Sequence, residues 1–291
     1  MSALFGPTGN CDSFNQQYKG TIHAPRWLRE LGLDCYEYQC GRGVNLGEDT
    51  ARNIGAAAAE QGILMSLHSP YFINLSSRDP ERVEKNLRYI EESCRAADRM
   101  GGDRVVVHCG GLTGMTRQEA LENTIENLSL ALQRLEEQGL SRVRLCIETM
   151  GKVNVLGDAE EVFAICRSDA RLLPCIDYGH LNARSQGGLS LPGALGALLD
   201  GMAAALGEER AAVHHAHFSK IEYSKGGEVK HLTFEDTQYG PEFSPLAEEL
   251  VRRGWSPRII CESAGTQAED AMEMKRMYQA AAAAAERKGS L

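Results

Sequence analysis

The sequence predicts an α/β fold, namely a single TIM-type (β/α)8 barrel domain over residues 1–291. Eight short apolar segments alternate with eight helical segments, which predicts a parallel sheet with right-handed crossovers. Eight such units over about 250 residues have the size of a barrel. Six of the apolar segments also end on a side chain that can bind a metal. A doubly wound open sheet would gather its ligands around one switch point, whereas a barrel brings all strand ends to one face.

The elements follow one another in strict alternation, without a linker rich in proline or serine. Asp79-Pro80 predicts a helix start, because an N-cap residue precedes proline at the first helical position. The expected strands are residues 4–9, 35–38, 63–68, 104–108, 142–148, 173–177, 212–218 and 258–262. The expected helices are residues 24–31, 48–61, 79–100, 116–138, a segment from 158 onward, 191–206, 242–253 and 267–287. The segment between the seventh strand and the seventh helix is expected to be a long polar loop.

The composition is that of an ordinary globular protein, with 43% hydrophobic and 24% charged residues. A net charge of −9 argues against a surface that is basic throughout, although a local basic patch stays compatible with it. Nine scattered cysteines without C-x-x-C spacing indicate reduced thiols rather than a disulfide framework. The chain has no signal segment and no apolar run near the ~18 residues of a membrane span. We therefore expect a cytoplasmic location.

Histidine and carboxylate side chains gather at the predicted strand ends and in the loops just after them. One histidine beside a strand is weak evidence, since most such residues are packed and hydrogen-bonded, but the joint pattern predicts a metal centre. Imidazole and carboxylate ligands without thiolates suit zinc or manganese. The candidate ligands are His68, His108, Glu148, Asp177, His180, His217, His231 and Glu262. His23, His214 and His215 are left out, the first as a surface residue and the others as alternating positions of one strand.

Two motifs carry a resemblance to a known family. His68-Ser-Pro-Tyr-Phe-Ile-Asn-Leu75 is similar to H-A-P-Y-x-I-N-L of the endonuclease IV family of apurinic/apyrimidinic endonucleases, and Cys175-Ile-Asp-Tyr-Gly-His180 resembles its C-I-D-T-C-H. Further matches fall at His108, Glu148, His217-Phe-Ser-Lys220 and Glu262-Ser263. The resemblance spans residues 35 to 275. It implies a xylose isomerase-like barrel with three zinc ions that hydrolyses the phosphodiester 5′ to an abasic site in damaged duplex DNA.

The resemblance also implies how the ligands divide among the metals. One ion would be held by His68, His108 and a bridging Glu148, and a second by Glu148, Asp177, His217 and Glu262. The third would take His180, His231 and the residue two positions before that histidine, which in the family is aspartate. Here that position is Val229, which cannot bind a metal; Glu228 and Asp236 are both left open as replacements.

Metal-dependent phosphodiester hydrolysis is the expected reaction, with a metal-bound hydroxide available near neutral pH. Glu148 would fix the metal spacing and Glu262 would orient or deprotonate the attacking water. Arg42 and Tyr71 are candidates to contact DNA.

A sugar isomerase or epimerase is the alternative reading of the same strand ends. Such barrels use one divalent metal, which would lie at Glu148, Asp177, His217 and Glu262, and two glutamates move protons beside a carbonyl. A barrel that binds a metal or a ligand without turnover is a third reading.

Overall fold

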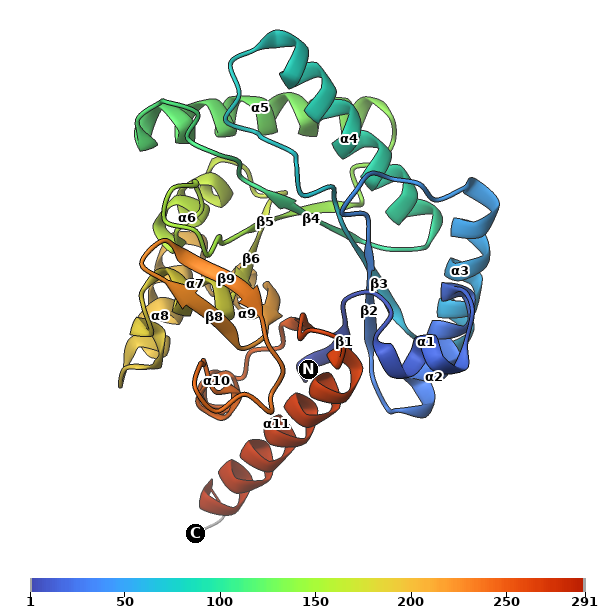
Figure 1. The fold of residues 1–291 in the computed structure, drawn as a ribbon, viewed down its shortest axis with the longest axis vertical. Coiled ribbons are helices and arrows are strands. Elements are labelled where there is room, and N and C mark those ends of the chain that lie inside the picture. The colour runs from blue at the N-terminus through green and yellow to red at the C-terminus, as the bar shows by residue number, and fades with distance from the viewer. Residues whose placement is uncertain (1, 290–291) are drawn as a thin grey trace.

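Eight parallel strands form a nearly closed barrel in the computed structural model, which describes residues 2–289 (Figure 1). The strands pair in the order β1-β10-β7-β6-β5-β4-β3-β2, and a parallel bridge from Thr8 to Glu37 links the two ends of that row. The predicted barrel is therefore confirmed. The strands are β1 (Leu4–Pro7), β2 (Cys35–Gln39), β3 (Leu64–His68), β4 (Arg104–His108), β5 (Arg144–Glu148), β6 (Leu173–Asp177), β7 (His215–Phe218) and β10 (Arg258–Cys261).

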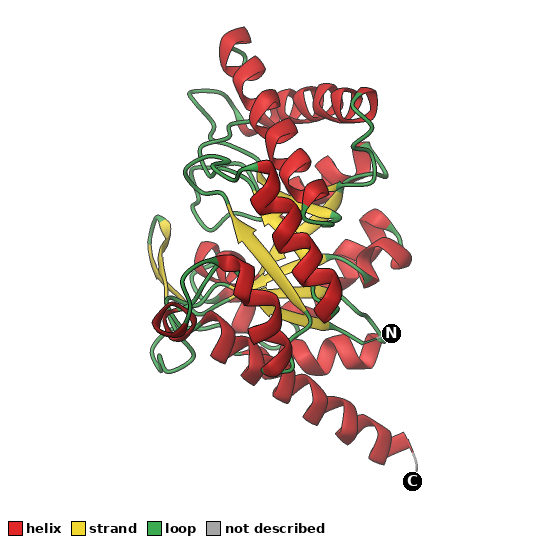
Figure 2. Cartoon of the chain, turned by 90° about the vertical axis from the view of Figure 1, so that its right-hand side faces the viewer, coloured by secondary structure: helices red, strands yellow, loops and turns green. Residues whose placement is uncertain are grey.

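Helices cover the outside of the barrel (Figure 2). Their apolar sides pack on the strands to form the main core, while polar sides face solvent. Capping boxes start two of them, one from Thr116 to Glu119 and one from Asp158 to Glu161, and each satisfies backbone N–H groups that would otherwise lack a partner. The helices are α1 (Asp12–Gln17), α2 (Ala24–Glu30), α3 (Glu48–Gln61), α4 (Pro80–Arg99), α5 (Arg117–Glu137), α6 (Ala159–Ser168), α7 (Tyr178–Arg184), α8 (Ala194–Leu206), α9 (Glu208–Ala212), α10 (Phe243–Arg253) and α11 (Gln267–Gly289).

The prediction of a long loop after β7 was wrong in one respect. The segment contains a hairpin of β8 (Ile221–Ser224) and β9 (Gly227–His231). The hairpin packs on α7 and projects from one end of the barrel (Figure 2). Its strands are short and largely solvated, so they lack the apolar alternation that marks a strand in sequence. Gly227, at φ +93°, lies so close to the Gly151 carbonyl that a Cβ would collide with it. The hairpin is thereby held against the loop that follows β5.

Three short helices were also missing from the expected elements. The helices α1, α7 and α9 have five to seven residues, too few for a periodic apolar pattern. Because α9 runs to Ala212, strand β7 starts at His215, later than the expected residue 212. Helix α7 begins directly after β6, so His180 lies on a helix rather than in a loop.

The nine cysteines are all buried as free thiols within the described residues, as the absence of paired spacing predicted. Four small and apolar side chains, Val106, Cys146, Leu173 and Cys175, form a separate cluster inside the barrel. Among residues 2–289 no helix is both long and apolar enough to span a membrane.

The loops after β3, β4 and β5 are tied to one another at the end of the barrel where the strands finish. The Asn74 side-chain oxygen accepts hydrogen bonds from Ser76 Oγ at 2.8 Å and from the Gly111 N–H at 3.1 Å. The Leu156 N–H donates to the Gly110 carbonyl at 3.1 Å. These contacts fix the side chains that line that end of the barrel.

Gly110→Ala is expected to destabilise the protein more than Gly114→Ala does. Both glycines have positive φ, so each substitution costs about 1 kcal/mol of backbone strain. A Cβ on Gly110 would also collide with the Asn74 side chain, which adds ~1–3 kcal/mol, whereas a Cβ on Gly114 would meet open space. Urea unfolding of the two variants tests this, and equal midpoints would contradict the assigned contact.

Candidate metal centre

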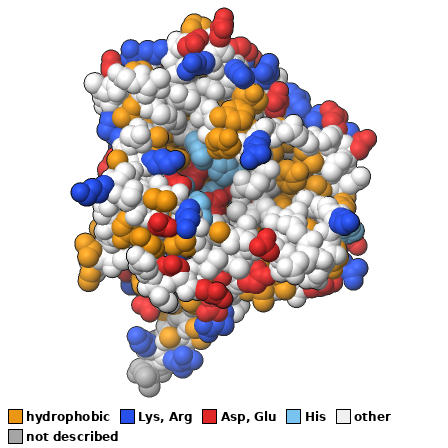
Figure 3. Space-filling model, in the orientation of Figure 1, with side chains coloured by type: hydrophobic (Ala, Val, Ile, Leu, Met, Phe, Trp, Pro, Cys, Tyr) orange, Lys and Arg blue, Asp and Glu red, His pale blue; other side chains and the backbone are white. Residues whose placement is uncertain are grey.

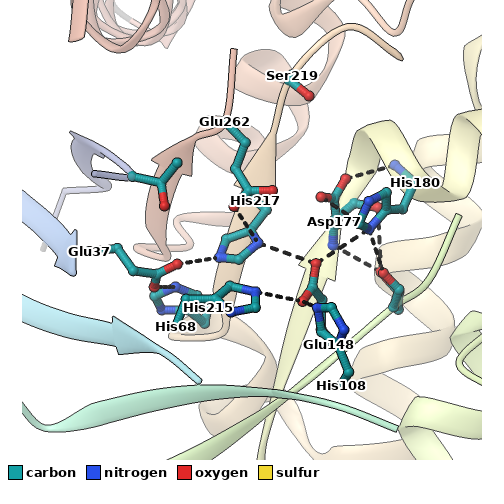
Figure 4. A network of polar contacts seen from close by, with 12 residues as sticks. Glu37, His68, His108, Glu148, Asp177, His180, His215, His217, Ser219 and Glu262 are labelled. Atoms are coloured by element: carbon teal, nitrogen blue, oxygen red, sulfur yellow. Dashed lines mark hydrogen bonds and ion pairs between the residues drawn. The ribbon is translucent and has the colours of Figure 1, made fainter. Parts of the chain in front are cut away.

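The carboxylate of Glu148, at the end of β5, lies at the centre of a ring of imidazoles (Figure 4). Its Oε2 lies 3.0 Å from His108 Nε2 and 3.2 Å from His68 Nε2. Its Oε1 lies 3.3 Å from His180 Nδ1 and 3.4 Å from His217 Nδ1. Glu148 is only 1% exposed, so both oxygens are shared among groups from different strands and removed from water. A carboxylate in this position is suited to bridge two cations.

The described residues contain five overlapping groups of potential metal ligands, and the ligand atoms of each group lie within 4.8 Å of one another. Two of the groups, His68-His217-Glu262 and Cys175-His215-His217, overlap at His217, and the other three together contain every ligand expected from the sequence. Every member of these three groups comes from a strand end, from the residues just after one, or from the β8–β9 hairpin. All eight ligands expected from the sequence are thus brought together at one end of the barrel. The three groups that contain the expected ligands are His68, His108 and Glu148; Glu148, Asp177, His217 and Glu262; and His180, Glu228 and His231.

The third group shows which residue takes the place left by Val229. Val229 is 51% exposed and is not part of the group. Its neighbour Glu228 places Oε2 3.4 Å from His180 Nε2. Asp236 lies elsewhere, and its side chain accepts hydrogen bonds from the Gln238 and Tyr239 N–H groups. Of the two replacements left open by the sequence, Glu228 falls in a candidate ligand group of the described residues and Asp236 does not.

Asp177 and His180 are oriented by the junction of β6 and α7. Asp177 is the N-cap of α7, and its Oδ1 accepts the His180 N–H at 2.7 Å. The other oxygen, Oδ2, is buried and has no hydrogen-bond partner among the described residues. The Nδ1 of His180 lies 3.0 Å from the Thr149 carbonyl, which directs Nε2 toward Glu228. One helix start thus positions ligands for two of the groups.

Other imidazoles are oriented by hydrogen bonds from the ring nitrogen that faces away from the centre. His68 Nδ1 lies 2.8 Å from the Ser69 carbonyl, and His231 Nδ1 lies 2.8 Å from Ser219 Oγ. A partner of this kind fixes the ring and its tautomer, which is the usual arrangement around a metal-binding histidine. In both residues Nε2 is left free to face the ligand group.

The donor chemistry fits divalent metal ions. Besides Asp177 Oδ2, the buried Nδ1 of His217, which faces Glu148 and Glu262, has no aligned hydrogen-bond partner in the described chain. Buried polar atoms without partners are costly and rare, so a cluster of them requires a compensating group. The ligand groups combine imidazole and carboxylate donors, which zinc and manganese accept. Burial raises the pKa of the Cys175 thiol well above its usual value, which disfavours a thiolate ligand beside them.

The pKa shifts of the centre favour protonated imidazoles beside ionised carboxylates. Burial alone would raise the pKa of Glu148, but the surrounding imidazoles, His108 first, hold it well below its usual value. Burial alone would lower the pKa of His68. The hydrogen bond to Glu148 and the negative charge of that carboxylate outweigh burial and raise the pKa of His68 to about 9. The pKa values of His180 and His217 are also raised well above normal, although burial opposes this. Asp177 is the chief cause for His180, and the carboxylates of Glu262 and Glu37 raise the pKa of His217. Positive charge between the carboxylates is therefore electrostatically favourable.

A cavity of about 550 Å³ opens above these groups (Figure 3). Histidine and acidic side chains form its floor, and hydrophobic and basic side chains surround the opening in this view. Tyr71, which is 59% exposed, Phe72 and Lys152 line the cavity. Arg42 is exposed and lies outside the lining, although its neighbour Gly41 is part of it.

Sequence reasoning missed Glu37 and Lys152, whereas the opposite orientations that it predicted for His214 and His215 are confirmed. Glu37 was hidden in an apolar strand and has no motif of its own. His214 contacts the Tyr178 hydroxyl at 3.0 Å on the helix side of β7, whereas His215 points inward to Glu37. His23 is exposed, as expected. Lys152 follows a Gly in the loop after β5 and could have been noticed only as a basic residue near a predicted strand end.

Comparison with known proteins agrees with this architecture. The family model described as a xylose isomerase-like TIM barrel matches residues 25–283. The uncharacterized protein MJ0133 of Methanocaldococcus jannaschii is 30% identical over 260 residues, which cover 89% of this chain and 91% of that protein. A probable endonuclease 4 of Acholeplasma laidlawii is 32% identical over 135 residues, so the match covers 44% of this chain and 45% of that relative.

Two solved structures show the same fold. Endonuclease IV from Thermus thermophilus has a TM-score of 0.63 at 22% identity, covering 96% of this chain and 98% of that one. A D-tagatose 3-epimerase-like protein has a TM-score of 0.67 at 19% identity, covering 88% of this chain and 91% of that one. From the family match and the barrel itself, the chain belongs to the xylose isomerase-like TIM-barrel family.

Proposed function

We propose that this protein is a metal-dependent phosphodiester hydrolase that incises duplex DNA 5′ to an abasic site. The observation that carries the proposal is the meeting of three ligand groups at the floor of one open cavity, with Glu148 shared between two of them. The similarity to a probable endonuclease 4 supports the same reaction class.

Zinc is the metal we expect, with manganese as the alternative, and the ligands would be the three groups described above. Glu148 would bridge the first two ions, and Glu228 would complete the third site with His180 and His231. When bound, such ions polarise phosphoryl oxygens and lower the pKa of water for attack.

The negative charge of the cavity floor supports the proposal that metal ions bind before a phosphate enters. Glu148, Glu228 and Glu262 line the cavity, and Asp177 offers a further carboxylate to the second ligand group. Without divalent cations these carboxylates would repel a phosphodiester, because like charges at short range disfavour binding. Bound ions are the largest local charges in such a site and would reverse its sign. A protein with a net charge of −9 would in this way bind an anionic substrate.

The chain's own residues would bind and orient the substrate. Glu262 faces the cavity with Oε1 3.5 Å from His217 Nδ1, where it can accept a proton from the attacking water. Lys152 can pair with a phosphate oxygen. Tyr71 and Phe72 present exposed aromatic rings at the rim, on which unpaired bases can stack. Arg42 would contact the DNA backbone from the neighbouring loop.

A sugar epimerase is the second candidate, and one observation favours it. Glu148, Asp177, His217 and Glu262 form a four-ligand group that would hold a single ion, and the fold resembles that of a D-tagatose 3-epimerase-like protein. Such an enzyme has no evident use for two further ligand groups. The additional histidines and Glu228 therefore favour the hydrolase.

We also propose that residues 1–291 form one barrel domain that acts in the cytoplasm. Nine buried free thiols support a reducing compartment.

His68→Ala is expected to abolish zinc- or manganese-dependent incision of a duplex that contains one abasic site. The variant removes a ligand of the first group, so incision should fall by at least about 100-fold, as losses at such sites do. His23→Ala, an exposed histidine far from the ligand set in sequence and outside the cavity lining, is the control and should keep full activity. Absence of incision by the wild-type protein above the His68→Ala background would sink the proposal.

Glu228→Ala is expected to remove one metal ion per chain, whereas the neighbouring Val229→Ala removes none. The reason is that Glu228 belongs to the third ligand group and Val229 is exposed outside it. Elemental analysis of protein purified without chelator should give three ions for the wild type and the control, and two for Glu228→Ala. A single ion in the wild type would favour the epimerase.

Zinc affinity is expected to rise as the pH increases from 6 to 9. The pKa of His68 is raised to about 9 in the metal-free state, so below that pH a proton must leave before the imidazole can bind zinc. His180 and His217 act in the same direction, because their pKa values are also raised. Calorimetric titrations in buffers of different ionisation enthalpy should show proton release on binding. A pH-independent affinity would contradict the assigned protonation states.

A further inference from the structure

Glu37 is a fully buried carboxylate that lies inside the barrel and belongs to none of the three ligand groups. It comes from the middle of β2, beside Ser66 of β3 in the sheet register. Figure 4 shows it on the side of His217 that faces away from Glu148. A buried carboxylate in an apolar strand is unfavourable unless its partners compensate it. Its contacts therefore indicate its role.

The two oxygens of Glu37 have different partners. Oε2 accepts a hydrogen bond from Ser66 Oγ at 2.9 Å and lies 2.9 Å from His215 Nε2. Oε1 lies 3.0 Å from His217 Nε2, at ion-pair distance. Two contacts thus anchor Oε2, and Oε1 lies beside His217 Nε2 at ion-pair distance without an aligned hydrogen bond.

The position of His217 Nε2 determines what its other nitrogen can do. Nδ1 faces the second ligand group, 3.4 Å from Glu148 Oε1 and 3.5 Å from Glu262 Oε1. A neutral imidazole carries one hydrogen, and a carboxylate beside Nε2 favours that hydrogen on Nε2. The lone pair is then on Nδ1, where a metal would bind.

We propose that Glu37 is a positioning residue that holds His217 in the orientation and tautomer required to bind a metal through Nδ1. This inference rests on the proposed metal centre and extends it to a residue that would not touch the metal. A carboxylate behind a metal-binding histidine both orients the ring and increases its basicity.

Two other rings of the centre have a neutral partner in the equivalent place. On the side that faces away from the ligand groups, His68 contacts a backbone carbonyl and His231 contacts a serine hydroxyl. His217 has a negatively charged partner there instead. Removal of the Glu37 charge should consequently weaken the second ligand group more than removal of a neutral partner would weaken its own group.

The barrel geometry explains how one carboxylate reaches two histidines. His215 and His217 are two residues apart on β7, so both side chains point into the barrel. Glu37 approaches them from β2, which is separated from β7 by β10 and β1 in the strand order. The carboxylate therefore reaches through the barrel interior and connects β2 with β7.

Glu37→Gln tests the proposal, because glutamine keeps the side-chain shape and removes the charge. Zinc affinity of the folded protein should fall by about 10- to 100-fold when measured by competition with a chelator of known affinity. Asp34→Asn is the matched control, since Asp34 lies three residues earlier and pairs with Lys275 outside the centre. The control should leave zinc affinity unchanged.

Ser66→Ala is the second variant, and it keeps Glu37 while removing one of its anchors. Its zinc affinity should fall by a few-fold, in the same direction as for Glu37→Gln. Unfolding of the metal-free proteins, followed by circular dichroism, separates a loss of affinity from a loss of fold.

The outcomes distinguish this inference from the proposed function. If wild-type protein binds zinc and both folded variants bind it equally well, the positioning role of Glu37 is overturned and the metal centre stands. If wild-type protein binds no divalent metal, the proposed function fails as well. A variant that is merely less stable, with unchanged zinc affinity, also overturns the inference.

Discussion

The structure at the end of the barrel where the strands finish depends on the burial of the Glu148 carboxylate among imidazoles. A buried negative charge must be compensated, and the cost of leaving it alone exceeds that of most single interactions in a folded protein. Four histidines from four different parts of the chain lie within about 3.5 Å of its oxygens. The raised pKa values of His68, His180 and His217 favour positive charge on these three rings, and divalent ions would supply more of it. The fold thus places the Glu148 carboxylate where nearby positive charge is needed to stabilise it.

The barrel makes this arrangement feasible because its strands end on one face. Side chains separated by up to about 200 residues in sequence meet there, and each is carried by a strand end or by the segment just after it. The junction of β6 and α7 places Asp177 and His180 without an intervening loop. The β8–β9 hairpin adds Glu228 and His231 from above, so the third ligand group depends on an element outside the eightfold pattern.

The solved structures that share this fold include an endonuclease IV and a D-tagatose 3-epimerase-like protein. The four-ligand group around Glu148 would be sufficient for proton transfer on a sugar held at one ion. Two further ligand groups adjoin it along the cavity. His68 and His108 supply one of them, and the hairpin supplies the other. A row of cations suits a phosphodiester, whose oxygens need charge stabilisation at several points. The difference between the two chemistries would therefore lie in the flanking ligands rather than in the barrel.

The sequence by itself determined the barrel and the eight candidate ligands. Period and length define the strands, and a histidine or carboxylate at the end of an apolar run is visible without a structure. Two motifs, at His68 and at Asp177–His180, were specific enough to indicate the family. Tertiary structure decided the rest. Glu228 could not be chosen over Asp236, because the hairpin that directs it toward His180 has solvated strands without a readable pattern. Glu37 could not be found, because its role depends on His215 and His217 from the far wall of the barrel, and no local pattern records a contact across 178 residues.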